Sequence, residues 1–133
     1  MHTDPGRPLH RIMFVEDNPD ITLVARLALE KIGGFEVRFC ASAEEALDAV
    51  EAFKPDMILL DVMLPGMDGP TLLQRLRQLE ECRETPFIFV TAKAQAKELR
   101  ELKATGVVDV IAKPFDALNL ASQLKEIWSG VPR

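Results

Sequence analysis

Five polar side chains each follow a short apolar run, and their chemical types suit work on a phosphoryl group. Glu16 and Asp17 follow the first run, Asp61 follows the third, Thr91 follows the fourth and Lys113 follows the fifth. A carboxylate can attack phosphorus and form an acyl phosphate. An ammonium group can balance charge on phosphoryl oxygens, and a hydroxyl can donate a hydrogen bond to one of them. We therefore expect Asp61 to accept a phosphoryl group with the help of Thr91 and Lys113.

The acidic members of this set predict a metal ion. Three carboxylates that meet at one place repel one another and raise each other's pKa values. A hard divalent cation removes this conflict, and Mg²⁺ binds few protein carboxylates, keeps several waters and shares its coordination with phosphate. We therefore expect Mg²⁺ beside Glu16, Asp17 and Asp61.

Taken alone, each of these residues also has an ordinary structural explanation. Asp17 could be the neighbour of a helix cap, Asp61 could merely end a strand, and Thr91 could be a loop hydroxyl with a local partner. Lys113-Pro114 could be a surface turn. The joint role is favoured because an acidic pair, an acid, a hydroxyl and a lysine occur in this order at successive strand ends.

The apolar runs themselves predict five strands. Continuous apolar runs at residues 12–15, 57–60 and 87–90 are typical of strands that are buried on both faces. Residues 35–39 alternate between apolar and polar, which is typical of an edge strand, and residues 107–111 are apolar with one interruption.

Between the strands the apolar period becomes helical, and cap residues mark the helix ends. We expect a first helix that is capped by Asn18, has Pro19 in its first turn and is stopped by Gly33-Gly34, and a second helix that opens with a capping box of Ser42 and Glu45. A third helix is expected over residues 70–79 and a weaker fourth over 95–104. The last helix is expected to be capped by Asp116 and to reach Trp128. Strands that alternate with helices predict a doubly wound α/β fold. We expect a five-stranded parallel sheet in the order 2-1-3-4-5, with helices on both faces and ligands bound beyond the carboxyl ends of the strands.

The chain resembles the receiver domain of bacterial two-component response regulators. The resemblance covers roughly residues 11–128, so we expect a flexible leader over 1–10, a receiver domain over 11–128 and a tail over 129–133. The matching stretches are Val15-Glu16-Asp17-Asn18, Leu60-Asp61-Val62-Met63-Leu64-Pro65-Gly66-Met67-Asp68-Gly69, Val90-Thr91-Ala92-Lys93 and Lys113-Pro114-Phe115.

This resemblance implies a flavodoxin-like fold and a phosphorylation switch. It implies that Asp61 takes a phosphoryl group from the phosphohistidine of a sensor histidine kinase or phosphotransfer protein. It also implies Mg²⁺ bound by Asp17, Asp61 and the backbone carbonyl of Met63, with Glu16 acting through water. Such a domain catalyses only its own phosphorylation and dephosphorylation, so we do not expect an enzyme in the usual sense.

One position departs from the family pattern. Receiver domains usually carry an aromatic residue three places before the lysine, and this residue changes rotamer on activation. Here the position is Val110, and the chain contains no tyrosine. The last helix also has little charge over residues 116–122. We therefore expect a monomer or weak dimer rather than strong dimerisation through the fourth helix, fifth strand and fifth helix.

Composition excludes several classes of partner. The net charge of −5 argues against direct binding to nucleic acid or to an anionic membrane. No apolar run is long enough to span a membrane, and the polar start of the chain is unlike a secretory signal, which favours a cytoplasmic protein. Cys40 and Cys82 have no metal-ligand spacing, so we expect buried or half-buried thiols.

Three other classes of protein share some of these features. A haloacid-dehalogenase-type phosphatase needs a second aspartate two places after the first, where this chain has Met63. A flavodoxin-type flavin module needs a phosphate-binding loop after the first strand, where Glu16 and Asp17 would repel phosphate. A protein-interaction module that works without phosphorylation remains the alternative, although the complete set of polar residues argues against it.

Overall fold

The predicted sheet is confirmed: it has five parallel strands in the order β2-β1-β3-β4-β5. The strands are β1 (Arg11–Val15), β2 (Glu36–Cys40), β3 (Met57–Asp61), β4 (Phe87–Thr91) and β5 (Asp109–Ala112). These come from a computed structural model, which describes residues 6–92 and 95–131. β3 and β4 are buried along their whole length, whereas β2 lies at an edge and is half exposed.

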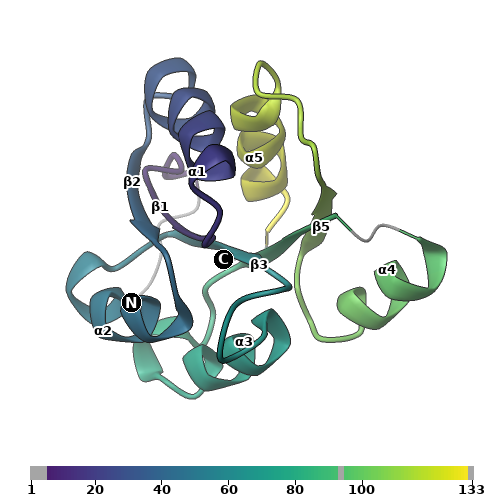
Figure 1. Ribbon diagram of the computed structural model, residues 1–133. Helices are drawn as coiled ribbons and strands as arrows, with labels where there is room; N and C mark the ends of the chain where they lie inside the picture. The colour runs from purple at the N-terminus through teal and green to yellow at the C-terminus, as the bar shows by residue number, and fades with distance from the viewer. Residues whose placement is uncertain (1–5, 93–94, 132–133) are drawn as a thin grey trace.

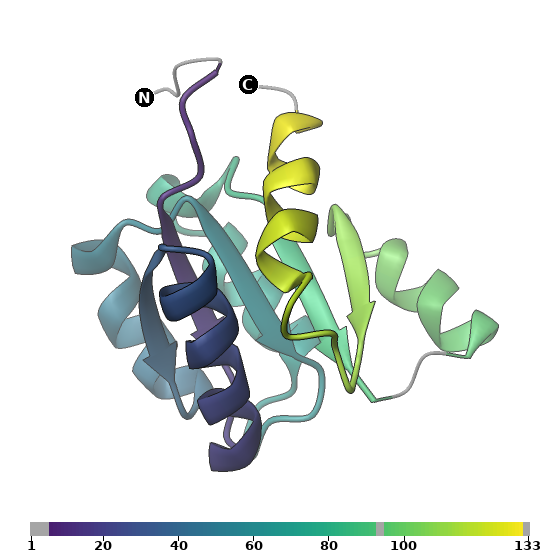
Figure 2. The same cartoon turned by 90° about the horizontal axis from the view of Figure 1, so that it is seen from above.

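Helices cover both faces of this sheet because successive side chains of a strand point to opposite sides. The helices are α1 (Pro19–Arg26), α2 (Ala43–Phe53), α3 (Gly69–Arg77), α4 (Ala96–Lys103) and α5 (Leu120–Ser129), with short segments η1 (Leu27–Ile32) and η2 (Glu80–Cys82). Figure 1 and Figure 2 show α2 and α3 on one side of the sheet and α1 and α5 on the other. Met13 of β1 packs into a core cluster with residues of α2, α3 and α4, while the next residue, Phe14, packs into a second cluster with α1 and α5. No helix within the described residues is long and apolar enough to cross a membrane.

The predicted caps of the first two helices are confirmed. The Asn18 side chain accepts a hydrogen bond at 2.8 Å from the second helical residue, and Pro19 opens the helix. Ser42 accepts from the backbone N–H of Glu45 at 3.1 Å, and the Glu45 carboxylate reaches back to the backbone N–H of Ala41 at 3.0 Å. These bonds satisfy N–H groups that a helix start otherwise leaves unpaired.

The first helix runs to Gly33 as predicted, but its second half, η1, is a π-helix. The backbone N–H of Gly33 donates to the carbonyl of Ala28, five residues earlier, at 3.1 Å. A Cβ at Gly33 would lie 2.8 Å from both the carbonyl oxygen of Leu29 and the Cβ of Ala121. Glycine therefore allows the end of this helix to approach α5 closely.

The predicted start of the last helix is wrong, because α5 begins at Leu120 and its cap is Asn119. The Asp116 side chain instead accepts from the backbone N–H of Leu118 at 3.0 Å and closes a turn before the helix. An aspartate can close such a turn as readily as it caps a helix.

Smaller differences concern two other elements. α3 begins one residue earlier than predicted, capped by Asp68, and it ends at Arg77. β5 begins two residues later than predicted, at Asp109, although Val107 before it is buried. Both expected thiols, Cys40 and Cys82, are buried and free.

The expected leader, residues 1–10, packs against the domain from Arg7 onward. The Arg7 guanidinium lies 2.8 Å from the Asp56 carboxylate, which also accepts two backbone N–H bonds at the start of β1. Leu9 is buried, and the indole N–H of Trp128 donates to the carbonyl of Arg7 at 2.7 Å. This segment, which we call the N-terminal strap (residues 7–10), ties the starts of β1 and β3 to the end of α5.

Candidate functional site

The carboxyl ends of four neighbouring strands meet at one edge of the sheet and bring the predicted residues together. β1 pairs with β3 in register, so Glu16 and Asp61 both lie just beyond the last paired positions of these two strands. Thr91 is the last paired residue of β4, and Lys113 directly follows its partner in β5. Residues up to 97 positions apart in the sequence therefore share one site.

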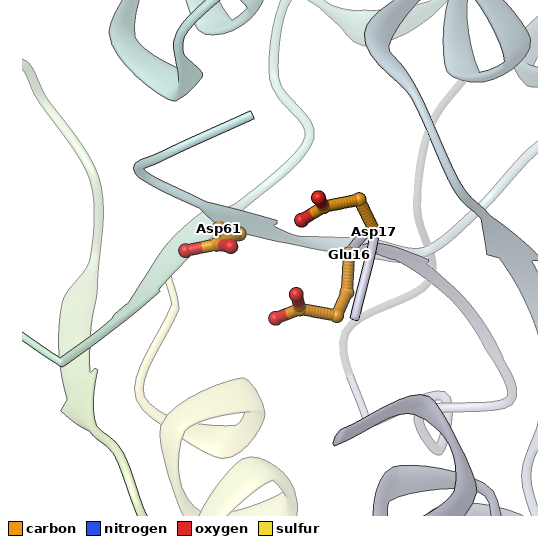
Figure 3. A group of neighbouring side chains, drawn as sticks. All are labelled: Glu16, Asp17 and Asp61. Atoms are coloured by element: carbon orange, nitrogen blue, oxygen red, sulfur yellow. The ribbon is translucent and has the colours of Figure 1, made fainter. Parts of the chain in front are cut away.

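The three acidic side chains form a compact cluster beyond β1 and β3 (Figure 3). Carboxylate oxygens of Glu16, Asp17 and Asp61 lie within 4.8 Å of one another. Glu16 and Asp61 are buried, whereas Asp17 is exposed and opens the cluster to solvent. A set of close oxygen ligands that water can reach fits Mg²⁺, which keeps part of its hydration shell.

Glu16 is the most enclosed of the three carboxylates. One of its oxygens lies 2.6 Å from the Lys113 ammonium, and the other accepts from the backbone N–H of Asn18 at 3.0 Å. Burial raises the pKa of Glu16 above its ordinary value, and the charge of Asp61 adds to this effect. The hydrogen bonds from Lys113 and Asn18 oppose the rise in pKa because they stabilise the ionised carboxylate.

Lys113 stands between the buried acids and is closer to Glu16 than to Asp61. Its Nζ is 3.2 Å from an oxygen of Asp61, and its side chain is only 12% exposed. Its backbone N–H donates to the carbonyl of Thr91 at 2.8 Å, which holds the ends of β4 and β5 together. The ion pair with Glu16 was not anticipated from the sequence, because contacts between side chains of distant strands depend on the exact register.

Thr91 ends β4, the strand that pairs with β3, and Met63 lies in the loop that follows Asp61. Thr91 is buried at the end of β4. The backbone N–H of Met63 points to an oxygen of Asp61 at 3.4 Å, and its side chain is 63% exposed. The loop after β3 thus curls back over Asp61, while Lys93, which belongs to the matching stretch after Thr91, lies outside the described residues.

Gly69 has a role in the site that the sequence interpretation missed. It begins α3, and a Cβ at this position would lie 2.5 Å from the backbone carbonyl oxygen of Asp61 and 3.0 Å from the ring of Phe89. Real Cβ atoms almost never approach a carbonyl oxygen that closely. Glycine therefore allows α3 to pack directly behind the acceptor strand, and the Met67-Asp68-Gly69 sequence was the available signal.

An open groove of about 400 Å³ leads from the acidic cluster along α1. Glu16 and Asp17 line one end, and side chains of α1 and the end of β2 line its walls, among them Leu23 and Phe39. Leu23 is 68% exposed, so one wall of the groove is apolar and open to solvent.

Comparison with known proteins identifies the family of this chain. The family model described as "Response regulator receiver domain" matches residues 12–125. The probable C4-dicarboxylate response regulator DctR of Halalkalibacterium halodurans is 34% identical over 90% of this chain. The phosphate regulon transcriptional regulatory protein PhoB of Rhizobium meliloti is 37% identical over 88%. The matches cover 51% of each of these relatives, so the chain spans about half of their length.

A solved structure agrees with this relationship. The putative response regulator from Chloroflexus aurantiacus superimposes with a TM-score of 0.82 at 34% identity, over 92% of this chain and 99% of the other. The chain therefore belongs to the response regulator receiver domain family of two-component systems.

Proposed function

We propose that this receiver domain accepts a phosphoryl group on Asp61 and changes conformation to pass on a signal. The observation that carries the proposal is the placement of Asp61, which is 6% exposed, in a carboxylate cluster with a lysine ammonium 3.2 Å away. A buried carboxylate between other acids and a cation is suited to a reaction in which negative charge arrives at the site.

In the proposed reaction, an oxygen of the Asp61 carboxylate attacks the phosphorus of a phosphohistidine on the partner. A P–O bond forms as the P–N bond breaks, and the released imidazole keeps the electron pair and takes up a proton. The product is an acyl phosphate, as expected when a carboxylate is the nucleophile. The open end of the cluster at Asp17 gives the donor side chain a way in.

The oxygen ligands present fit Mg²⁺. Asp17 and Asp61 would hold the metal with the backbone carbonyl of Met63, and Glu16 would act through water. When bound, Mg²⁺ supplies positive charge that offsets the carboxylates and the phosphoryl oxygens.

Lys113 and Thr91 hold the product. The Lys113 ammonium, already 3.2 Å from an Asp61 oxygen, pairs with a phosphoryl oxygen once the group is attached. The Thr91 hydroxyl donates to another phosphoryl oxygen. Because Thr91 ends β4, a movement of its side chain moves the loop that leads to α4, which is the proposed output of the switch.

The partner that fits this chemistry is a sensor histidine kinase or a phosphotransfer protein in the cytoplasm. The domain catalyses its own phosphorylation and dephosphorylation and no other reaction. Its net charge of −5 argues against direct nucleic-acid binding. A phosphorylation-independent interaction module is not favoured, because it would not need the acids, Thr91 and Lys113 at one site.

Phosphorylation with acetyl phosphate and Mg²⁺ tests the proposal. Intact mass spectrometry should show the addition of one phosphoryl group that is stable in acid and lost in base. Asp61→Asn should abolish it, whereas Asp48→Asn, at an exposed position of α2, should leave it unchanged. Undiminished labelling of the Asp61 variant would show that the acceptor is another residue.

A further inference from the structure

Helix α4 packs against the rest of the domain mainly through its carboxyl end. Of its eight residues, only Leu102 is buried, and it packs into the core cluster on that face of the sheet. At the amino end, the Gln95 side chain makes no capping hydrogen bond. Figure 2 shows α4 at the outer edge of the molecule, beside β5. With so little buried surface, the first turns of this helix have low local stability.

The chain directly after α4 is held firmly. Val107 is buried in the same core cluster, and the backbone N–H of Val108 donates to the carbonyl of Phe87, at the start of β4, at 2.9 Å. Between the helix and Val107, Gly106 has a φ of +95°, a left-handed conformation that glycine adopts without strain. Gly106 therefore lies at the joint between a loosely packed helix and a fixed strand.

Arg77, the last residue of α3, holds this joint from the neighbouring helix. One guanidinium nitrogen donates to the carbonyl of Thr85 at 2.8 Å, and the other lies 3.5 Å from the carbonyl oxygen of Gly106. The guanidinium also lies over the ring of Phe87, 4.5 Å from its centroid. A planar guanidinium can bond to separate groups and stack on a ring at the same time, which suits this position. Arg77 therefore links the end of α3, the start of β4 and the turn after α4.

The clamp and the proposed phosphorylation site lie at opposite ends of β4. Phe87, which Arg77 covers, begins this strand, and Thr91 ends it. The chain then reaches the amino end of α4 at Ala96. A signal from the site thus enters α4 at its loosely packed end, while Arg77 acts on the other end.

We propose that α4 is hinged at Gly106 and that Arg77 is the positioning residue that fixes the hinge. Phosphorylation then moves the first turns of α4 and leaves its carboxyl end in place. Hinges of this kind use a few residues at the end of an element to absorb the change in backbone angles. The direction of the movement rests on the proposed phosphorylation switch, whereas the hinge itself is a property of the unphosphorylated protein.

Amide hydrogen exchange of the unphosphorylated protein tests the hinge. Within α4, the backbone N–H of Leu99 is bonded at 2.9 Å and that of Ala104 at 3.0 Å, yet Leu99 should exchange at least about tenfold faster, because the first turns open on their own. In Arg77→Met, Ala104 and Gly106 should exchange about tenfold faster than in the natural protein, whereas Leu99 should not change. Arg75→Met removes an exposed arginine of the same helix and is the matched control, which should alter none of these rates.

Amide NMR spectra with and without beryllofluoride measure how far the switch extends. In the natural protein, the shifts should reach the first turns of α4 and fade before Gly106. In Arg77→Met they should extend to Gly106 and Val108, because the end of the helix is no longer held. A purely structural arginine would lower stability in this variant without changing where the spectrum responds. Arg77→Lys keeps the charge but cannot bridge Thr85 and Gly106, so it should loosen Gly106 as well.

The inference would be overturned by equal exchange of Leu99 and Ala104 in the natural protein, or by unchanged exchange of Ala104 and Gly106 in folded Arg77→Met. Beryllofluoride shifts that already extend through Val108 in the natural protein would also contradict it. If Arg77→Met does not fold, the exchange of Gly106 in Arg77→Lys decides. If beryllofluoride shifts no amide near Asp61 or Thr91, the proposed switch is wrong, and the exchange rates still judge the hinge.

Discussion

At the residue scale, the three carboxylates of the cluster differ in what surrounds them. Glu16 is enclosed and bonded through both oxygens, whereas Asp17 is exposed. An exposed carboxylate can turn toward an incoming cation at little cost, but Glu16 must first loosen its bonds to Lys113 and Asn18. The two neighbours in sequence should therefore contribute unequally to metal binding.

This difference predicts the response of Mg²⁺ affinity to single substitutions. Asp17→Asn should weaken Mg²⁺ binding by about tenfold or more, because it removes a charged ligand. Glu16→Gln should weaken it less, because its contact runs through water. Titration calorimetry of both variants checks this, with Asp20→Asn, an exposed aspartate of α1, as the control. Affinities like that of the natural protein in both cluster variants would refute the site.

At the scale of the elements, the packing of α3 behind β3 depends on the absence of a side chain at Gly69. Gly69→Ala would place a Cβ 2.5 Å from the Asp61 carbonyl oxygen, so the start of α3 or the end of β3 must move. We expect a loss of about 1–3 kcal/mol in the free energy of unfolding and slower labelling of Asp61 by acetyl phosphate. Denaturant unfolding and mass spectrometry measure the two effects.

Gly130→Ala is the matched control for this substitution. The nearest atom to a Cβ at Gly130 is the carbonyl oxygen of Ile127 at 3.7 Å, an ordinary contact. Its free energy of unfolding should change by no more than about 0.5 kcal/mol. Equal stability and equal labelling rates in the two variants would mean that α3 does not position Asp61.

The end of β4 gives a second prediction at this scale. Thr91→Ala should still accept a phosphoryl group, but the phosphorylation-dependent changes in amide NMR spectra around the loop to α4 should shrink, because the hydroxyl that links them is gone. Thr91→Ser keeps the hydroxyl and should retain most of the response. A full spectral shift in Thr91→Ala would exclude this coupling role.

The elements were predictable from the sequence where one local signal dominates. Buried strands such as 57–60 have no competing pattern, and Gly33-Gly34 stops the first helix as expected. The start of α5 was not predictable, because Asp116 can close a turn or cap a helix and only packing decides between them. The π-helical turn of η1, whose end at Gly33 lies against Ala121 of α5, was not predicted either, because the apolar pattern of the segment does not distinguish it from an α-helix.

For the site, strand ends in a parallel sheet meet at one edge, so the convergence of Glu16, Asp61 and Lys113 followed from their positions in the chain. The closer pairing of Lys113 with Glu16 did not, since a difference of 0.6 Å between two acids depends on side-chain packing. Gly69 was overlooked because the importance of an absent side chain appears only once its neighbours are known.

At the scale of the whole molecule, we expect assembly to depend on the face formed by α4, β5 and α5. Val110 is half-buried and packs against the core cluster beneath α4, so it offers no large side chain that could swing outward. A β-branched residue is also stiff about χ1. Residues 116–122 carry a single charged side chain, Asp116, so the start of α5 offers few candidates for ion pairs between two copies.

We therefore expect a monomer or a weak dimer, even in the activated state. Light scattering with and without beryllofluoride, a phosphate analogue, measures the mass directly. The mass should stay close to the 14.8 kDa of one chain at micromolar concentration. A tight dimer that forms on activation and is lost in Asp109→Ala or Asn119→Ala would contradict this expectation.

The contact of Trp128 with the N-terminal strap has a consequence for optical studies. Trp128 is the only tryptophan of the chain, and its indole is held by Arg7, which pairs with Asp56 at the start of β3. Asp61 lies at the other end of that strand, about 17 Å away at the usual rise per residue. Intrinsic emission will therefore follow detachment of the strap and global unfolding, but it will stay nearly silent when a cation or beryllofluoride enters the acidic cluster. A fluorescent reporter of ligand binding has to be introduced, and an exposed position along the groove, such as Leu23, is a suitable place for it.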